Sequence, residues 1–415
     1  MKRILMLMLL APVACAPAGT DGSAVPAVRI SAPDAEVRPG VEVLVSNPPA
    51  VLEGKRVGLI TNHTGRDRSG TSTIDLLARS PRMRLVALFA PEHGIRGTAA
   101  EGELVSSTVD QRTGLPIHSL YGETRKPTPE MLEGVEALVF DIQDVGARQY
   151  TYVYTMAFGM QAAAEKGIPF VVLDRANPVT GTRVEGNILD PAFSTFVGMY
   201  PIASRHGMTA GELAQLFNQE FGFGAELTVV PVEGWRREMW FDQAGLEWIP
   251  PSPNLPTLQS AIHYPGTVYL EGTNLSEGRG TDHPFEQTGA PWLRAAEVAE
   301  QMNAMRLPGV RFEAVEFAVR AEAAKYGGER LPGVRLILTD RESYRPLNVV
   351  LHLIATIRRM HPEDFEWRPS HFDRLAGTDR LRQAIDEGTL PALLQEWERD
   401  AERFRQQRAP YLIYR

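Results

Sequence analysis

Short apolar runs alternate with segments whose apolar positions recur every three or four residues. In the first half of the chain, the apolar runs predict strands at 56–62, 85–89, 137–142, 170–173 and 227–230. The helical spacing predicts helices at 72–79, 151–166 and 209–221, and Thr209 is suited to cap the last of them. Strands that alternate with helices are typical of parallel sheets with crossover helices. The pattern therefore predicts an α/β fold with a Rossmann-like, doubly wound parallel sheet.

This alternation stops in the stretch 234–256, which contains three tryptophans and the proline-dense sequence IPPSPNLP. Such a stretch is typical of a long ordered connection, and we place a domain boundary at residue 250. Beyond it, the pattern predicts strands at 310–319 and 334–338 and helices at 346–360, 379–387 and 391–405. We therefore expect the Rossmann-like domain at 38–250 and a smaller α+β domain at 251–415 that contributes to the active-site cleft.

The N-terminal residues resemble a secretory signal. Two basic residues precede an apolar run at 4–10, and small residues lead to Cys15, the single cysteine of the chain. The run is too short to span a bilayer. Cys15 stands where a bacterial lipoprotein signal is cut and its cysteine acylated, although Pro12 departs from that pattern. We predict a signal peptide at 1–15 with lipidation of Cys15; simple secretion after cleavage near Ala14 or Ala16 is the alternative.

Residues 16–37 are rich in Ala, Pro, Gly and Ser without apolar periodicity, which predicts a flexible tether. The expected location is therefore the cell envelope, with the protein anchored in a membrane facing the periplasm, free in the periplasm, or secreted. Membrane contact is expected only through the N-terminal lipid.

Several classes of function are disfavoured by composition and motifs. A formal charge of −8 without a basic cluster argues against nucleic acid as a partner. The sequence contains no P-loop, no GxSxG and no HExxH, and its first strand does not lead into GxGxxG. We therefore expect no nucleotide cofactor, no serine nucleophile and no metal.

Polar and charged residues follow the predicted parallel strands, where open sheets place their sites. They are Asn62, His63, Glu92, His93, Gln143, Asp144, Arg148, Tyr150, Asp174, Arg175 and Asn177. Each also has an ordinary structural interpretation: Asp174 and Arg175 can form a local ion pair, and Asn62 and Asn177 suit turns. Their shared position at one sheet edge predicts a polar crevice.

Glu92 is the strongest catalytic candidate in that crevice. It follows an apolar strand, is preceded by Pro91, and is followed by His93 and Gly94, where glycine allows the backbone to approach a ligand closely. A structural or purely binding role for Glu92 is the alternative, and His93 either binds substrate or orients the loop.

A second polar patch spans 264–286, whose Gly, Asn, Ser and Thr content disfavours a regular helix. It offers many hydrogen-bonding groups to a polyhydroxylated ligand, although a polar interdomain loop would have the same composition. Aromatic residues such as Tyr121 and Tyr150 could stack on a sugar or belong to the core.

Five motifs make the chain recognisable: VGLITNHTG, FAPEHGIRG, FDIQDVGARQYTYVYTM, PSPNLPTLQSAIHYPGT and EGTNLSEGRGTDHPFEQTGAPW. They resemble the NamZ-type exo-β-N-acetylmuramidases, from about residue 41 to the C-terminus. In LDRANP the family commonly has proline in place of Ala176, which affects loop shape more than chemistry. The resemblance implies a glycoside hydrolase that removes terminal N-acetylmuramic acid from the non-reducing end of peptidoglycan-derived muropeptides or disaccharides.

The resemblance makes Glu92 the glutamate of the PEHG motif, which is the family's leading catalytic candidate. For the second catalytic group, Glu277 and Asp144 rank first and Asp174 and Glu271 second, and assistance by the substrate's 2-acetamido group is a third route. Arg148, Arg175 and Arg279 are candidates for binding the lactyl carboxylate of muramic acid. The substrate-binding candidates are Asn62, His93, Tyr121, Gln143, Arg148, Tyr150, Asp174, Arg175, Asn177, Asn254, Glu271, Asn274 and Arg279. A non-catalytic envelope lipoprotein that binds cell-wall sugars is the competing interpretation.

Overall fold

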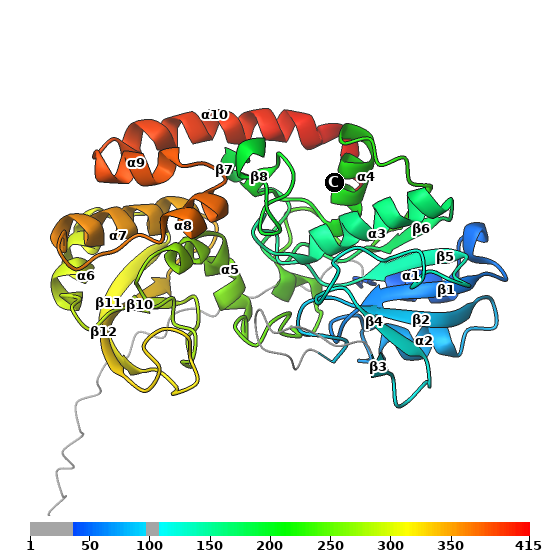
Figure 1. The fold of residues 1–415 in the computed structure, drawn as a ribbon. Coiled ribbons are helices and arrows are strands. Elements are labelled where there is room, and N and C mark those ends of the chain that lie inside the picture. The colour runs from blue at the N-terminus through cyan, green and yellow to red at the C-terminus, as the bar shows by residue number, and fades with distance from the viewer. Residues whose placement is uncertain (1–35, 97–107) are drawn as a thin grey trace, which may run out of the picture. The chain divides into compact units, whose positions relative to one another are not determined.

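A central seven-stranded sheet organises the first half of the computed structural model, which describes residues 36–96 and 108–415 (Figure 1). The strand order is β3-β4-β2-β1-β5-β6-β9, and all neighbours are parallel except β3 and β4. The strands are β1 Arg56–Thr61, β2 Arg84–Ala90, β3 Thr108–Val109, β4 Pro116–Ser119, β5 Ala137–Asp141, β6 Phe170–Leu173 and β9 Leu227–Val230. The predicted parallel sheet is confirmed, and two short strands extend one edge.

Helices cover both faces of this sheet because successive strand residues point to opposite sides. Leu59 packs in the cluster beneath α1 Gly40–Ser46 and α2 Thr73–Ala78, whereas Ile60 packs in the cluster that includes α3 Tyr152–Lys166 and α4 Ala210–Glu220. α4 begins where predicted: Thr209 and Glu212 form a capping box.

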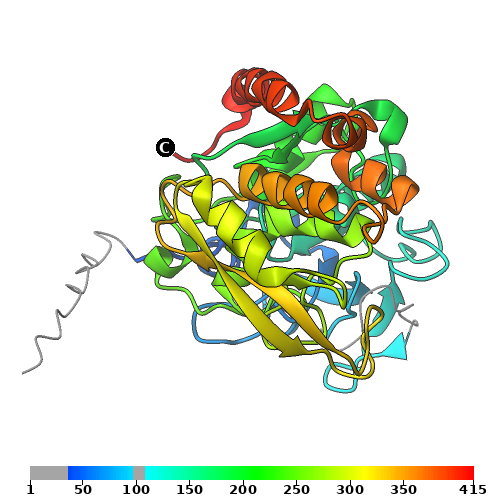
Figure 2. The same cartoon turned by 90° about the vertical axis from the view of Figure 1, so that its left-hand side faces the viewer.

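The second half of the chain contains a three-stranded antiparallel sheet, in the order β10 Gln287–Gly289, β12 Arg330–Leu338, β11 Val310–Ala318. α6 Ala295–Ala304 packs on β11 and β12, and α7 Pro346–Met360 packs against α6 (Figure 2). The remaining helices are α5 Leu258–Thr267, α8 Pro369–Ala376, α9 Arg380–Asp386 and α10 Leu390–Arg408. The predicted smaller α+β part is confirmed, although β10, α5, α6 and α8 were not predicted.

Two features join these halves. α10 runs over the small antiparallel pair β7 Glu185–Ile188 and β8 Ala203–Arg205 of the first half (Figure 1). One hydrophobic cluster also includes both Phe140 of the first sheet and Ile354 of α7. The described residues of both halves therefore form one compact unit by contacts, and the boundary at residue 250 stays a prediction.

The described helices include none that is long and apolar enough to cross a membrane. The predicted signal peptide, Cys15 and residues 16–35 of the tether lie outside the described residues.

Candidate active site

A cavity of about 340 Å³ lies at the carboxyl end of the first sheet, and residues from both halves of the chain line it. Glu92 and His93 follow β2, and Tyr150 lies between β5 and α3. Its described lining is Glu92, His93, Tyr121, Arg125, Gln149, Tyr150, Thr151, Thr195, Phe196, Val197, Ser252, Asn254, Leu255, Tyr264, Val268, Glu271, Arg279, Phe285, His371, Arg374 and Leu375. The two polar patches of the sequence thus meet in one cavity.

Glu92 reaches this cavity from a tight turn after β2. The Gly94 N–H donates to the Pro91 carbonyl over 3.0 Å, and His93 and Gly94 have φ angles of 66° and 71°. A left-handed conformation is uncommon for a non-glycine residue and is frequent at functional sites. The Thr151 hydroxyl donates to Glu92 Oε2 over 3.0 Å, so the half-buried carboxylate is oriented from the opposite loop.

Glu271 is the other carboxylate among the described lining residues. It lies in a 3-10 helix, Val268–Gly272, and accepts a 3.0 Å hydrogen bond from Arg279 Nη2. His371 Nε2 lies 3.6 Å from its second oxygen. Glu271 therefore faces the cavity with its charge balanced by Arg279.

Glu277 lies behind Arg279 and outside the described lining. Its side chain is buried, and it pairs with Lys325 Nζ at 2.9 Å and Arg279 Nη1 at 3.0 Å. Burial alone would raise the pKa of Glu277, but Lys325 and Arg279 reverse this effect and lower it to about 2. A carboxylate that stays ionised is unsuited to donate the proton. Because Glu277 pairs with Arg279 and Lys325 outside the described lining, it contacts Arg279 rather than the cavity.

Asp144 also lies outside the described lining and is buried. Its Oδ2 accepts a 2.7 Å hydrogen bond from the Gly146 N–H and lies 3.6 Å from His206 Nε2. Gly146 has a φ of 81°, and a Cβ there would collide with Asn177 and Val179. Asp144 therefore shapes the loop that leads to Tyr150.

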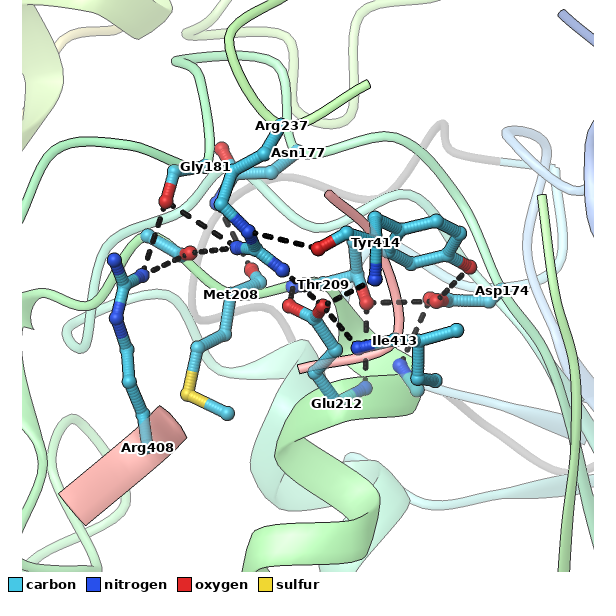
Figure 3. Close-up of polar contacts among 12 residues, drawn as sticks. Asp174, Asn177, Gly181, Met208, Thr209, Glu212, Arg237, Arg408, Ile413 and Tyr414 are labelled. Carbon is cyan, nitrogen blue, oxygen red and sulfur yellow. Dashed lines mark hydrogen bonds and ion pairs between the residues drawn. The ribbon is translucent and has the colours of Figure 1, made fainter. Parts of the chain in front are cut away.

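Asp174 and Asn177 form part of a buried network that anchors the C-terminal residues (Figure 3). Asp174 accepts hydrogen bonds of 2.6 Å from both Thr209 Oγ1 and the Tyr414 hydroxyl, and one of 2.8 Å from the Gly211 N–H. Burial raises the pKa of Asp174 to about 6, and these hydrogen bonds oppose the rise. Asn177 donates to the Met208 carbonyl over 2.8 Å.

Three other predicted residues have internal partners close to their own strands. The Arg175 guanidinium donates to both carboxylate oxygens of Asp141, at 2.5 and 3.0 Å. Gln143 donates to the carbonyl of Ala176 over 2.9 Å, and Asn62 accepts two hydrogen bonds from Thr64. These residues fix the sheet edge and are outside the described lining.

Arg148 is fully buried and joins the first half to α8. Its Nη1 donates to the Asn187 carbonyl over 2.9 Å, and its Nη2 donates to the Ala376 carbonyl over 2.8 Å. Of the three arginines predicted to bind a carboxylate, the described lining includes Arg279 and neither Arg148 nor Arg175.

Of the remaining residues predicted to bind substrate, three line the cavity and one does not. Tyr121, Tyr150 and Asn254 line the cavity, and the Tyr150 ring packs edge-on against Tyr264 with centroids 5.7 Å apart. Asn274 instead bonds the backbone of Asp364 over 2.8 Å and is outside the described lining.

Sequence analysis missed four lining residues that carry charge or an aromatic ring: Arg125, Phe196, His371 and Arg374. Arg125 and Phe196 come from irregular segments, and His371 and Arg374 come from α8, which was not predicted. We find no local sequence signal that distinguishes them from other surface residues.

Comparisons with known proteins agree with this architecture. The sequence-family model for the N-terminal part of exo-β-N-acetylmuramidase NamZ matches residues 57–259, and the model for the C-terminal part matches residues 262–414. The peptidoglycan β-N-acetylmuramidase NamZ of Bacillus subtilis is 46% identical over 98% of this chain and 97% of its own length.

Two crystal structures of DUF1343-family proteins from Bacteroides fragilis resemble the fold. One is 37% identical with a TM-score of 0.85, and the other is 33% identical with a TM-score of 0.75. Each match covers 92% of this chain and 99% of the solved chain. The chain therefore belongs to the exo-β-N-acetylmuramidase NamZ family.

Proposed function

We propose that this protein is an exo-acting glycoside hydrolase that removes β-1,4-linked N-acetylmuramic acid from the non-reducing end of peptidoglycan fragments. The observation that carries the proposal is Glu92, which a strained turn and the Thr151 hydroxyl hold in the wall of the cavity. Membership of the NamZ family and the 46% identity to the B. subtilis muramidase support the substrate class.

The size of the cavity suits a terminal sugar. Its volume of about 340 Å³ is at the lower end of the range of ligand sites, about 300–1,000 Å³. The aromatic side chains of Tyr121, Tyr150 and Phe196 belong to its wall and give it apolar surface suited to a pyranose. A site of this kind favours removal of one end residue over binding along a glycan strand.

In the proposed reaction, Glu92 donates a proton to the glycosidic oxygen as its bond to the anomeric carbon breaks. Water supplies the hydroxyl that the anomeric carbon gains, and the proton that the water releases restores Glu92. Glu271 is the second carboxylate of the described lining, and it forms an ion pair with Arg279. It is placed to stabilise positive charge on the sugar or to orient the 2-acetamido group.

Hydrolysis of a chromogenic β-N-acetylmuramide tests this function. The wild-type protein is expected to release the chromophore, and Glu92→Gln to lose nearly all activity while keeping its melting temperature. Glu133→Gln, an exposed glutamate outside the cavity lining, is the matched control and should remain active. Binding of wall fragments by the wild type without release would instead indicate the sugar-binding lipoprotein, and full activity of Glu92→Gln would refute the assignment.

We also propose that the enzyme acts in the cell envelope, tethered through a lipid on Cys15. The support is the sequence MKRILMLMLLAPVAC, whose basic start, short apolar run and following cysteine match a lipoprotein signal.

A further inference from the structure

Three arginines belong to the described lining of the cavity: Arg125, Arg279 and Arg374. Arg279 is already engaged, with Glu271 and Glu277 each 3.0 Å from its guanidinium nitrogens. Within the described part of the chain, neither Arg125 nor Arg374 has an acidic partner within 4.0 Å. These two arginines are therefore cations of the cavity wall that no described carboxylate pairs with directly.

Arg125 is held by aromatic rings rather than by a carboxylate. Its guanidinium carbon lies 4.1 Å from the ring centroid of Phe196 and 5.7 Å from that of Tyr121. Phe196 in turn stacks on Phe158, with centroids 6.2 Å apart and planes at 12°. A guanidinium stacked on a ring keeps its N–H groups in its own plane, where they can bind a carboxylate with two hydrogen bonds.

The position of Arg374 has a simpler explanation. It lies in the last turn of α8, where the exposed carbonyl groups of a helix favour a cation regardless of any ligand. No comparable helix end accounts for Arg125, which lies in an irregular segment. Arg125 is therefore the better candidate for binding an anion.

We propose that Arg125 binds the lactyl carboxylate of the terminal sugar and thereby selects muramic acid over glucosamine. This inference rests on the proposed function. The two sugars differ by the 3-O-lactyl group, whose carboxylate is a bidentate partner for a guanidinium. Tyr121 and Phe196 hold the guanidinium and also line the cavity, so the anion-binding group stands beside surfaces suited to the sugar ring.

Steady-state kinetics on the chromogenic muramide test this role. Arg125→Gln should raise KM about 10- to 100-fold, as expected for the loss of hydrogen bonds to a charged group, with a smaller effect on kcat. Arg125→Lys should give an intermediate KM because it keeps the charge and loses the planar fork. Lys126→Gln is the matched control: Lys126 neighbours Arg125 but pairs with Glu165 at 2.5 Å outside the described lining.

Competitive inhibition gives a second readout that a structural role would not change. Free N-acetylmuramic acid should inhibit the wild type more strongly than N-acetylglucosamine, and Arg125→Gln should remove that difference. Arg125 is exposed, so the variant is expected to keep its melting temperature.

Three outcomes separate failure of the proposed function from failure of the role of Arg125. No hydrolysis by the wild type would refute the proposed function itself. Hydrolysis with unchanged KM and unchanged inhibitor preference in Arg125→Gln would refute the role of Arg125 alone. A raised KM in Arg374→Gln with none in Arg125→Gln would also overturn it and transfer carboxylate binding to α8.

Discussion

Glu92 is oriented by two parts of the chain, the left-handed turn at His93 and the hydroxyl of Thr151 at the start of α3. The first comes from its own motif and the second from a residue 59 positions away. A carboxylate fixed at both its backbone and its oxygen loses little freedom when substrate binds, which is the arrangement that proton transfer requires.

Removing the hydroxyl of Thr151 should therefore impair catalysis more than stability. Thr151→Val keeps the shape of the side chain but loses the 3.0 Å hydrogen bond to Glu92, and we expect kcat on the muramide to fall about 10-fold. Thr151→Ser restores the donor and should recover most of the activity. An unchanged kcat in Thr151→Val would show that the hydrogen bond does not position Glu92.

The sequence predicted those residues of the candidate site whose own motif brings them to the cavity. It did not predict residues whose role depends on partners far away in the chain. Glu92, His93 and Glu271 line the cavity because their own segments lead to it. The environment of Glu277 depends on Lys325, 48 residues away, and no local pattern reports that ion pair. Arg125 was missed for the same reason, since its aromatic partner Phe196 comes from another segment.

At the scale of elements, strands buried on both faces were the easiest to predict. β1, β2, β5 and β6 are almost entirely apolar because helices cover both sides of the sheet. β4 contains a proline and a histidine within four residues, and β3 has only two residues. Neither segment therefore shows the run of apolar residues that predicts a strand. α8 contains few apolar residues and forms against η4, Val268–Gly272, a contact that its own sequence does not encode.

The buried ion pairs of Glu277 should make the second half of the molecule sensitive to acid. Its folded pKa of about 2 is below the ordinary value of 4.5, so its stabilisation is present above pH 4.5 and is lost as the pH falls towards 2. Glu277→Gln leaves the half-buried Lys325 and Arg279 with one anion fewer, and should lower the free energy of unfolding by about 3 kcal/mol at neutral pH.

Urea unfolding between pH 2 and 7 measures this contribution. The variant should lose part of the decline in stability that the wild type shows between pH 4.5 and 2, because the titrating group is gone. Glu316→Gln removes an exposed ion pair with Arg330 and should change stability little. If the stability of the wild type and of Glu277→Gln falls equally between pH 4.5 and 2, the loss of stability does not come from Glu277.

At the scale of the whole molecule, the cavity depends on both halves of the chain. The N-terminal family segment supplies Glu92 and Tyr150, and the C-terminal segment supplies Glu271 and Arg279. The hydrophobic cluster shared by Phe140 and Ile354 holds these groups in place. Neither half alone contains both carboxylates of the described lining.

Cys15 should decide where the enzyme is found. With the lipid, wild-type protein is expected in the membrane fraction and in the detergent phase on partitioning, whereas Cys15→Ser should be soluble with unchanged specific activity. Labelling with a fatty acid analogue should mark the wild type alone. A wild-type protein that stays in the aqueous phase would indicate simple secretion instead.

The anchoring of Tyr414 also sets an order of events during folding. Asp174 at the end of β6 receives this hydrogen bond from a residue 240 positions later in the chain. If the chain is exported from its N-terminus, as the signal predicts, Asp174 crosses the membrane before Tyr414 does. The buried network around Asp174 is then completed only after the C-terminal residues have followed.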